Sequence, residues 1–295
     1  MSLAPSLIIQ ARPKDLGGFS VARVLPYKKR RMVGPFIFAD HLGPTVMEPD
    51  ARVDVRPHPH IHLATVTYLF EGEMDHRDSL GSVQRIHPGA INLMTAGRGI
   101  AHSERTPAHL TDQSFPMHGM QIWIALPDGQ EKIEPAFDHY PADDLPVRES
   151  EGVQRSTLMG TFWNMVSPVK TYSPTLYASL STEQLHTETL HDLPEELGIY
   201  VVTGAIIYED VEYAAGQMLV FDPQPTDTLT LHLAPGTKVM LLGGDAIGER
   251  HIWWNFVSSD KADIEQAKLD WREGNFAQVP EETERTPLPE DWQAV

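Results

Sequence analysis

The stretch "RPHPHIHLATVTYLFEGE", residues 56–73, places three histidines at alternate positions directly before an apolar, β-branched and aromatic run. Successive side chains of an extended chain point to opposite faces, so His58, His60 and His62 would lie on one side of a strand. Alternate residues rise by roughly 6–7 Å, which leaves His58 and His62 about 13 Å apart. Only neighbouring histidines of this series can share a partner, and the spacing alone does not choose between the two pairs.

The prolines of this stretch limit where it can lie in a sheet. Pro57 and Pro59 lack the backbone donor that a central strand needs, so we expect a strand entry, an edge strand or a loop here. The run from Leu63 to Phe70 is then the true strand, and the histidines lie at its rim. A rim is a suitable place for a metal ligand, although a histidine on an apolar face can equally be structural.

The rest of the chain reads as many short strands joined by tight turns. Its 295 residues include 24 prolines and 21 glycines at short intervals, which is typical of an all-β sandwich or barrel. The predicted strands are residues 36–39, 63–70, 82–87, 90–94, 117–126, 175–180, 197–202, 217–221, 229–233, 238–243 and 250–257. One helix is predicted in "SDKADIEQAKLDWREGNF", residues 259–276, begun by Ser259 or Asp260 and ended by Gly274. Its apolar face would carry Ile264, Ala267 and Trp271.

A weak internal repeat indicates two domains. "TYLFEGEMDH" followed by "IHPGAINLM" has a counterpart in "IYVVTGAIIY" followed by "YAAGQMLVF", which aligns Gly72 with Gly204 and Gly89 with Gly216. This pattern predicts two copies of one β-domain, residues 1–145 and 146–295, although chance similarity between hairpins remains the alternative. The second copy has no H-x-H before its first strand, so only the first is expected to bind metal.

Composition excludes several classes of protein. A net charge of −18 argues against general binding to nucleic acid, and the basic cluster "YKKRRM", residues 27–32, is read as a solvated turn. No apolar run reaches the ~20 residues that a membrane helix needs, and the N-terminus has no secretory pattern, so we expect a cytoplasmic protein. Without cysteine, any metal must be held by nitrogen and oxygen.

A second informative stretch is "PGAINLMTAGRGIAHSERT", residues 88–106. His102 and Glu104 stand at i and i+2, so both would point the same way from a strand. An antiparallel neighbour beside His58 and His60 would bring four ligands to one point. Three imidazoles and one carboxylate suit a divalent first-row metal such as Fe(II), with Zn as the chemical rival and Ni, Cu, Mn and Co not excluded.

Several motifs together resemble one known family, the pirins of the cupin superfamily. They are, in chain order, "RRMVGPFIFADHLGP", "PHPH" with "ATVTYLFEG", "MTAGRGIAHSE", "HGMQIWIALP", "SPVKTYSPTLY" and "IWWNFVSS". The resemblance implies a bicupin, in which two double-stranded β-helix domains accompany a short C-terminal helix, with iron in the N-terminal domain. It also implies that the metal ligands are His58, His60, His102 and Glu104. His62 departs from the pattern, because many relatives have glycine there.

The resemblance implies two kinds of function. The first is quercetinase-like dioxygenase activity on a flavonol or another small phenolic or enolic substrate, with Glu104 both as ligand and as catalytic base. The alternative is a non-catalytic, iron-dependent, redox-sensing regulator that binds a transcription factor or metabolic enzyme. Zinc-dependent hydrolase or isomerase chemistry is a third. We expect a monomer, and we expect His41, His87, His109, His118 and His139 to be surface or hydrogen-bonded histidines outside the site.

Overall fold

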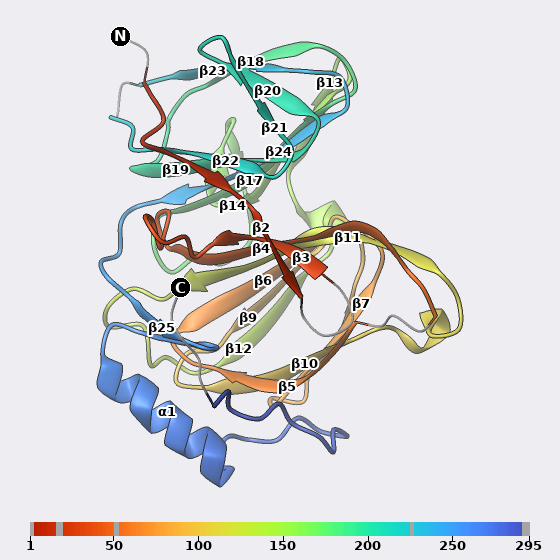
Figure 1. Ribbon diagram of the computed structural model, residues 1–295, viewed down its shortest axis with the longest axis vertical. Coiled ribbons are helices and arrows are strands. Elements are labelled where there is room, and N and C mark those ends of the chain that lie inside the picture. The colour runs from red at the N-terminus through yellow and green to blue at the C-terminus, as the bar shows by residue number, and fades with distance from the viewer. Residues whose placement is uncertain (1–2, 16–19, 50–52, 225–226, 291–295) are drawn as a thin grey trace. The chain divides into compact units, whose positions relative to one another are not determined.

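The computed structural model describes residues 3–15, 20–49, 53–224 and 227–290, and it confirms an all-β protein with a short helix near the C-terminus (Figure 1). Within these ranges, no helix combines the length and the apolar character needed to cross a bilayer. Nearly every strand is short, which agrees with the spacing of prolines and glycines along the chain.

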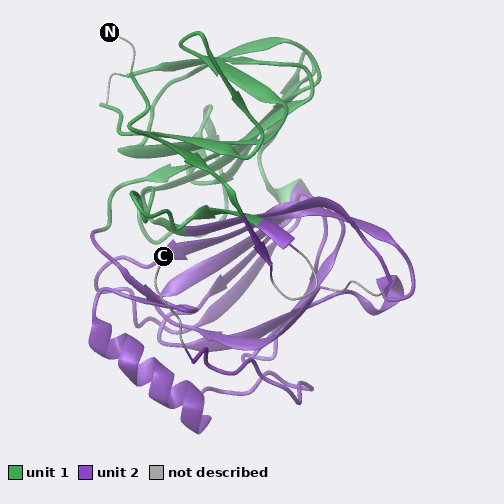
Figure 2. Ribbon diagram, in the orientation of Figure 1, with its two compact units in different colours: residues 1–12, 22–37, 143–247 green, residues 13–21, 38–142, 248–295 purple. Residues whose placement is uncertain are grey.

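The chain forms two compact units, drawn in different colours in Figure 2. Unit 1 comprises residues 1–12, 22–37 and 143–247, and unit 2 comprises residues 13–21, 38–142 and 248–295. A division into residues 1–145 and 146–295 differs from these units at both ends of the chain. The last 48 residues, 248–295, with the C-terminal helix, belong to the unit that holds "PHPH".

Two antiparallel sheets provide most of unit 2, which carries the histidines of "PHPH". The larger has the order β12 (Ala136–Tyr140), β9 (Ile91–Thr95), β6 (Leu63–Glu71), β11 (Phe115–Ala125), β4 (Phe36–Met47), β3 (Ser20–Leu25) and β2 (Arg12–Asp15). The smaller has the order β5 (Asp54–His60), β10 (Ile100–Arg105), β7 (Met74–Asp78) and β8 (Val83–Ile86). A 3-10 turn, η1, lies at Ala108–Leu110, and a second, η2, at Ala142–Asp144.

The other unit repeats this arrangement. Its larger sheet has the order β1 (Leu7–Gln10), β22 (Gln217–Phe221), β19 (Glu196–Thr203), β24 (Thr237–Gly244), β17 (Thr175–Thr182), β14 (Val153–Met159) and β13 (Val147–Ser150). The smaller has the order β18 (His186–Leu190), β23 (Leu229–Leu233), β20 (Ala205–Tyr208) and β21 (Val211–Ala214). A hairpin of β15 (Thr161–Phe162) and β16 (Met165–Val166) completes the unit.

The internal repeat of the sequence corresponds to equivalent turns. Gly72 follows β6 and Gly204 follows β19, and both have positive φ angles, of 87° and 72°. A Cβ at Gly72 would lie 2.3 Å from the Pro116 carbonyl oxygen, and one at Gly204 would lie 2.4 Å from Thr237 Oγ1. Neither turn therefore has room for a side chain, which is why the glycines recur at matching points of the two copies.

The helix α1 (Lys261–Glu273) begins and ends as its sequence predicts. Asp260 accepts a hydrogen bond from the Ala262 backbone N–H, and Gly274 ends the helix with a φ of 80°. Its apolar face packs in a cluster formed by Ile61, Ala101, Phe256, Ile264, Ala267, Trp271 and Val279, with Trp253 and Trp254 half-buried beside them. The two tryptophans are thus packing residues.

One predicted strand is wrong in its shape. Residues 250–257 were expected to form a single strand, but β25 (His251–Trp253) and β26 (Phe256–Ser258) are the two arms of a hairpin. Trp254 has a φ of 53°, which turns the backbone between the arms. The apolar composition of this stretch gave no sign of the turn, because neither glycine nor proline marks it.

Candidate metal centre

Strands β5 and β10 bring three histidines together. The strands pair antiparallel, with His58 opposite His102 and His60 opposite Ile100. One nitrogen from each of His58, His60 and His102 lies within 4.8 Å of the other two, and all three side chains are buried. Strand β5 is the edge of its sheet, as its prolines require. The pairing anticipated from H-x-H and H-x-E is therefore present.

Backbone carbonyls fix the orientation of two of these rings. His58 Nδ1 lies 3.0 Å from the Arg56 carbonyl oxygen, and His60 Nδ1 lies 3.1 Å from the Asn255 carbonyl oxygen. A carbonyl oxygen can only accept, so each Nδ1 carries the proton and each Nε2 keeps its lone pair. The turn at Trp254 thus positions an acceptor for a ligand far away in the sequence.

The third ring is held by a chain of side chains. His102 Nδ1 lies 3.4 Å from His76 Nδ1, and His76 Nε2 donates to Asp78 Oδ2 at 3.1 Å. Asp78 is fully buried and its Oδ1 accepts from the backbone N–H groups of Leu80 and Ser82. Because the carboxylate fixes the proton of His76 on Nε2, the His102 Nδ1 is the donor and its Nε2 is free.

The electrostatics keep these imidazoles neutral. Burial lowers the pKa of His58 to about 4, and it lowers the pKa values of His60 and His102 well below their usual range. The buried Nε2 atoms of His60 and His102 have no hydrogen-bond partner among the described residues. A buried polar atom without a partner is costly, and a lone pair on a neutral imidazole is the form that binds metal. The site therefore fits a divalent cation.

Glu104 lies beside this group but does not join it. Its side chain is buried, and its Oε1 accepts a hydrogen bond from Gln121 Nε2 at 3.1 Å. Gln121 is oriented in turn by Thr67, whose hydroxyl donates to Gln121 Oε1 at 2.7 Å. Burial raises the pKa of Glu104 to about 7, while the hydrogen bond from Gln121 acts against this shift. The structure thus gathers three of the four expected ligands.

His62 takes a different direction from the other two histidines of its stretch. Its backbone has a φ of 60°, which breaks the alternation of the strand and explains why glycine suits this position. Its Nδ1 lies 3.1 Å from Ser258 Oγ, near the start of α1, and the side chain is buried. Of the two possible pairs, the structure brings His58 and His60 together.

The scattered histidines lie outside the cluster. His41 and His118 form a buried pair with their Nε2 atoms 2.9 Å apart, and His139 Nδ1 lies 2.6 Å from Asn92 Oδ1. His87 and His109 are exposed and lie near Glu73. These positions agree with the expectation that the five are surface or hydrogen-bonded residues.

Sequence reasoning missed the residues that support the cluster. His76 and Asp78 stand at i and i+2 in "MDHRD", a spacing that signals side chains on one face of a strand but was not used. Gln121 and Asn255 carry no such signal. Each acts through an atom whose position depends on strand pairing or on a hairpin turn.

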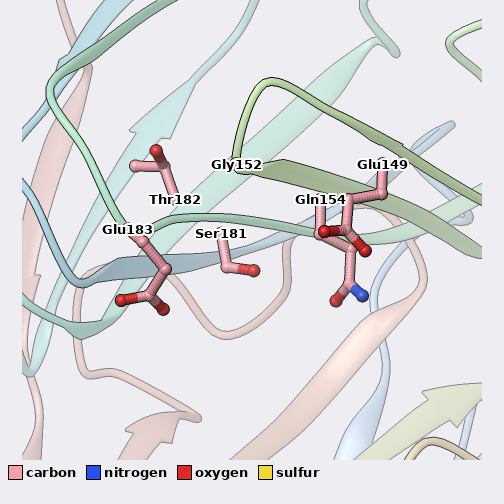
Figure 3. Close-up of a pocket in the computed structure, with 6 residues that line it drawn as sticks. All are labelled: Glu149, Gly152, Gln154, Ser181, Thr182 and Glu183. Carbon is pink, nitrogen blue, oxygen red and sulfur yellow. The ribbon is translucent and has the colours of Figure 1, made fainter.

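Unit 1 contains a hollow of a different kind. It has a volume of about 210 Å³, and Figure 3 shows polar and acidic side chains around it. Its lining consists of Glu149, Gly152, Gln154, Ser181, Thr182 and Glu183. These residues offer no imidazole, and we assign no chemistry to the hollow.

The fold and the site define a class. Two double-stranded β-helix domains, one of which presents three neutral imidazoles from adjacent strands, make the protein a bicupin with a candidate metal centre.

Comparison with known proteins identifies the family within this class. The chain belongs to the pirin family: the Pirin model matches residues 18–124, and the Pirin C-terminal cupin domain matches residues 178–277. A pirin-like protein of Caulobacter vibrioides is 45% identical over 290 residues, which covers 96% of this chain and 99% of the relative.

Solved structures agree with this assignment. A crystal structure of a quercetin 2,3-dioxygenase from Acinetobacter baumannii is 35% identical, has a TM-score of 0.89, and is matched over 96% of this chain and 94% of its own. A bacterial pirin of Escherichia coli, solved in complex with nickel(II), is 18% identical with a TM-score of 0.65, over 82% of this chain and 99% of its own. At that identity the second likeness shows the fold alone.

Proposed function

We propose that His58, His60, His102 and Glu104 bind one divalent metal, with Fe(II) as the expected ion. The observation that carries the proposal is the set of three neutral imidazoles, within 4.8 Å of one another, with their Nε2 atoms available. A nitrogen-rich site with one carboxylate suits iron, and it also accepts Zn, Ni, Mn, Co or Cu. Glu104 completes the set by leaving Gln121.

We propose further that the protein is a dioxygenase that acts on a flavonol such as quercetin, or on another small phenolic or enolic molecule. The support is the likeness to a quercetin 2,3-dioxygenase of Acinetobacter baumannii at 35% identity over nearly the whole chain. Bound Fe(II) would take up a deprotonated hydroxyl of the substrate and raise its electron density for reaction with O₂.

Glu104 is the proposed base that takes the proton from the substrate hydroxyl. Its pKa of about 7, set by burial, makes the carboxyl able to hold or release a proton near neutral pH when no cation is bound. A neighbouring cation lowers that pKa, so Glu104 is a stronger base when it detaches. Gln121 supplies the hydrogen bond that receives Glu104 in the detached position.

The test is anaerobic reconstitution with Fe(II), quantification of metal by mass spectrometry, and measurement of oxygen uptake with a flavonol. We expect one iron per chain, with oxygen uptake that needs both iron and flavonol and is lost in Glu104→Ala. Full iron content in His102→Ala and Glu104→Ala after exhaustive dialysis would show that the ligand assignment is wrong.

The regulatory alternative has its own outcome in the same experiment. One iron per chain without oxygen uptake would favour a metal-dependent protein that binds a partner. A monomeric state and a cytoplasmic location stay predictions, to be checked by light scattering of the purified chain and by fractionation of cells.

A further inference from the structure

The two faces of strand β10 carry side chains with different contacts. His102 and Glu104 lie on the metal side, whereas Ala101, Ser103 and Arg105 alternate with them and lie on the opposite side. The opposite side contacts residues 279–286, which follow α1 and which we call the C-terminal strap. The strap therefore lies behind the strand that carries two of the proposed ligands.

Glu282 is the main polar contact of the strap. Its Oε1 accepts from Ser103 Oγ at 2.7 Å and from Arg105 Nε at 3.0 Å, and its Oε2 accepts from Arg105 Nη2. The carboxylate is mostly buried, with 12% of its side chain exposed. Hydrogen bonding from Arg105 holds the pKa of Glu282 below its usual value, so the group is an anion at neutral pH.

The strap is itself fixed to the unit. The Thr286 backbone N–H donates to the Pro57 carbonyl oxygen at 2.8 Å, and Trp271 Nε1 donates to the Thr286 carbonyl oxygen at 2.9 Å. Val279 is buried in the cluster that includes Ala101 and Trp271. Glu282 thus acts from an anchored segment.

The contact of Glu282 falls where the backbone ladder is irregular. His102 pairs with His58, but Glu104 pairs with Val55, so the register of β10 against β5 shifts between the two proposed ligands. The extra residue lies on β5, where Arg56 and Pro57 both stand opposite Ser103, so the ladder between β5 and β10 is interrupted there, while β10 stays in continuous register with β7. Glu282 binds Ser103, the β10 residue that faces this bulge, and Arg105, two residues further along β10.

We propose that Glu282 is a positioning residue for the metal centre: it holds β10 from behind, opposite the bulge of β5, and so fixes His102 and Glu104 relative to the histidines of β5. The inference rests on the proposed metal site. Side chains behind the ligands of a metal site commonly change its affinity by 10–100-fold when removed. Glu282 lies on the far side of the strand from the metal, so it would act through the backbone.

The neighbouring residue provides a matched control. Glu281 lies in the same strap and carries the same charge, but it is exposed and binds Arg77, a half-buried residue of β7. Removal of either glutamate changes the net charge equally. Only removal of Glu282 takes away the contact with β10.

The experiment titrates the metal-free full-length chain with Co(II) and follows the visible absorption of the ion, together with hydrogen exchange of the β10 amides. We expect Glu282→Ala to weaken Co(II) binding about tenfold, to change the absorption spectrum, and to speed exchange at residues 103–105. Glu282→Gln, which keeps the acceptor oxygen, should recover part of the affinity. Glu281→Ala should bind Co(II) within about twofold of the unmodified chain.

Two results would overturn the inference, and they have different meanings. If the unmodified chain binds Co(II) and Glu282→Ala binds it with the same affinity and spectrum, Glu282 serves folding alone, even where thermal stability falls. If the unmodified chain binds no Co(II), the metal site is wrong and the inference falls with it. Should Glu282→Ala fail to fold, Glu282→Gln decides the question by the same comparison with Glu281→Gln.

Discussion

The two four-stranded sheets of the molecule have the same strand order, but one buries histidines where the other buries leucines. In one, β5 and β10 place His58, His60 and His102 in a buried cluster. In the other, the equivalent strands β18 and β23 bury leucines, namely Leu190, Leu229, Leu231 and Leu233. One backbone arrangement thus supports either a buried histidine cluster or an apolar core, and the side chains at a few inward positions decide which.

The difference teaches what the histidines require. Leucines need only burial, which contributes roughly 25 cal/mol for each Å² of apolar surface removed from water. Buried imidazoles need partners for their N–H groups, and the histidine sheet provides them through Arg56, Asn255 and His76. The hairpin of β25 and β26 supplies one of these partners, through the carbonyl oxygen of Asn255.

The largest expected effect is on the stability of unit 1, whose four-stranded sheet buries leucines and which we call the leucine-lined unit. Leu231 is fully buried, so Leu231→Ala should lower the free energy of unfolding by about 3 kcal/mol through lost burial and a cavity. Metal content should not change, because β23 provides no ligand. Denaturant unfolding and metal analysis of one sample test both parts. Leu185→Ala, at a side chain that is 76% exposed, is the control and should change stability by less than about 0.5 kcal/mol.

A substitution in the sheet of β5 and β10 should instead lower metal affinity. His60→Ala removes one proposed ligand, and we expect metal affinity to fall at least about a hundredfold, or ~2.7 kcal/mol. Isothermal titration with Co(II) measures the change. His232→Ala, at an exposed histidine of β23, should leave affinity as it was. Equal losses in the two variants would contradict the assignment of the site to one sheet.

Acid should weaken the histidine-bearing unit before the leucine-lined unit. Burial, helped by the neighbouring His118, lowers the pKa of His41 to about 4. The unfolded chain takes up this proton near pH 6.5 and the folded unit only near pH 4, so stability is complete above pH 6.5 and falls as the pH drops toward 4. The difference between these two pKa values of His41 corresponds to roughly 3 kcal/mol of stability lost at low pH.

Unit 1, which contains the leucine-lined sheet, should lose stability over a lower range of pH. Burial raises the pKa of Glu188, but hydrogen bonds from Arg155 and His186 outweigh it and hold the pKa below 4.5. The stability from this group is present above pH 4.5 and is lost only below it. As the pH is lowered, hydrogen exchange of the metal-free protein, corrected for intrinsic rates, should show that amides in unit 2 lose protection before amides in unit 1. The His41→Gln variant should lose less protection in unit 2 than the unmodified protein. Loss of protection at the same pH in both units would contradict the predicted difference in their acid stability.

The smallest effect concerns His62. His62→Gly removes a buried ring and its hydrogen bond to Ser258 but relieves a positive φ, so the effects on stability oppose each other. Iron content should stay the same while turnover of a flavonol changes. Metal analysis and an oxygen electrode measure the two quantities. A variant without iron would mean that His60 and His62 are the binding pair.

Much of the site was readable in the sequence because strand periodicity is local. The alternation in H-x-H and H-x-E placed His58 with His60 and His102 with Glu104, and the family resemblance selected this pair over His60 and His62. The supporting residues were not found, since Asn255 and Glu282 reach the site across 195 and 179 positions of the chain. The hairpin at Trp254 was missed because the residue with the positive φ is a tryptophan and not a glycine, which would have signalled a turn.

By itself, the sequence determined the class of fold, the two copies and the residue types available to a metal. Alternation, turn residues and the absence of cysteine are properties of short segments, so no tertiary contact is needed to read them. Only the tertiary structure decided which nitrogen of each imidazole is free, that Glu104 rests on Gln121, and that the C-terminal segment lies behind β10. These depend on contacts between distant segments, and the energy of such contacts is not encoded in any local pattern.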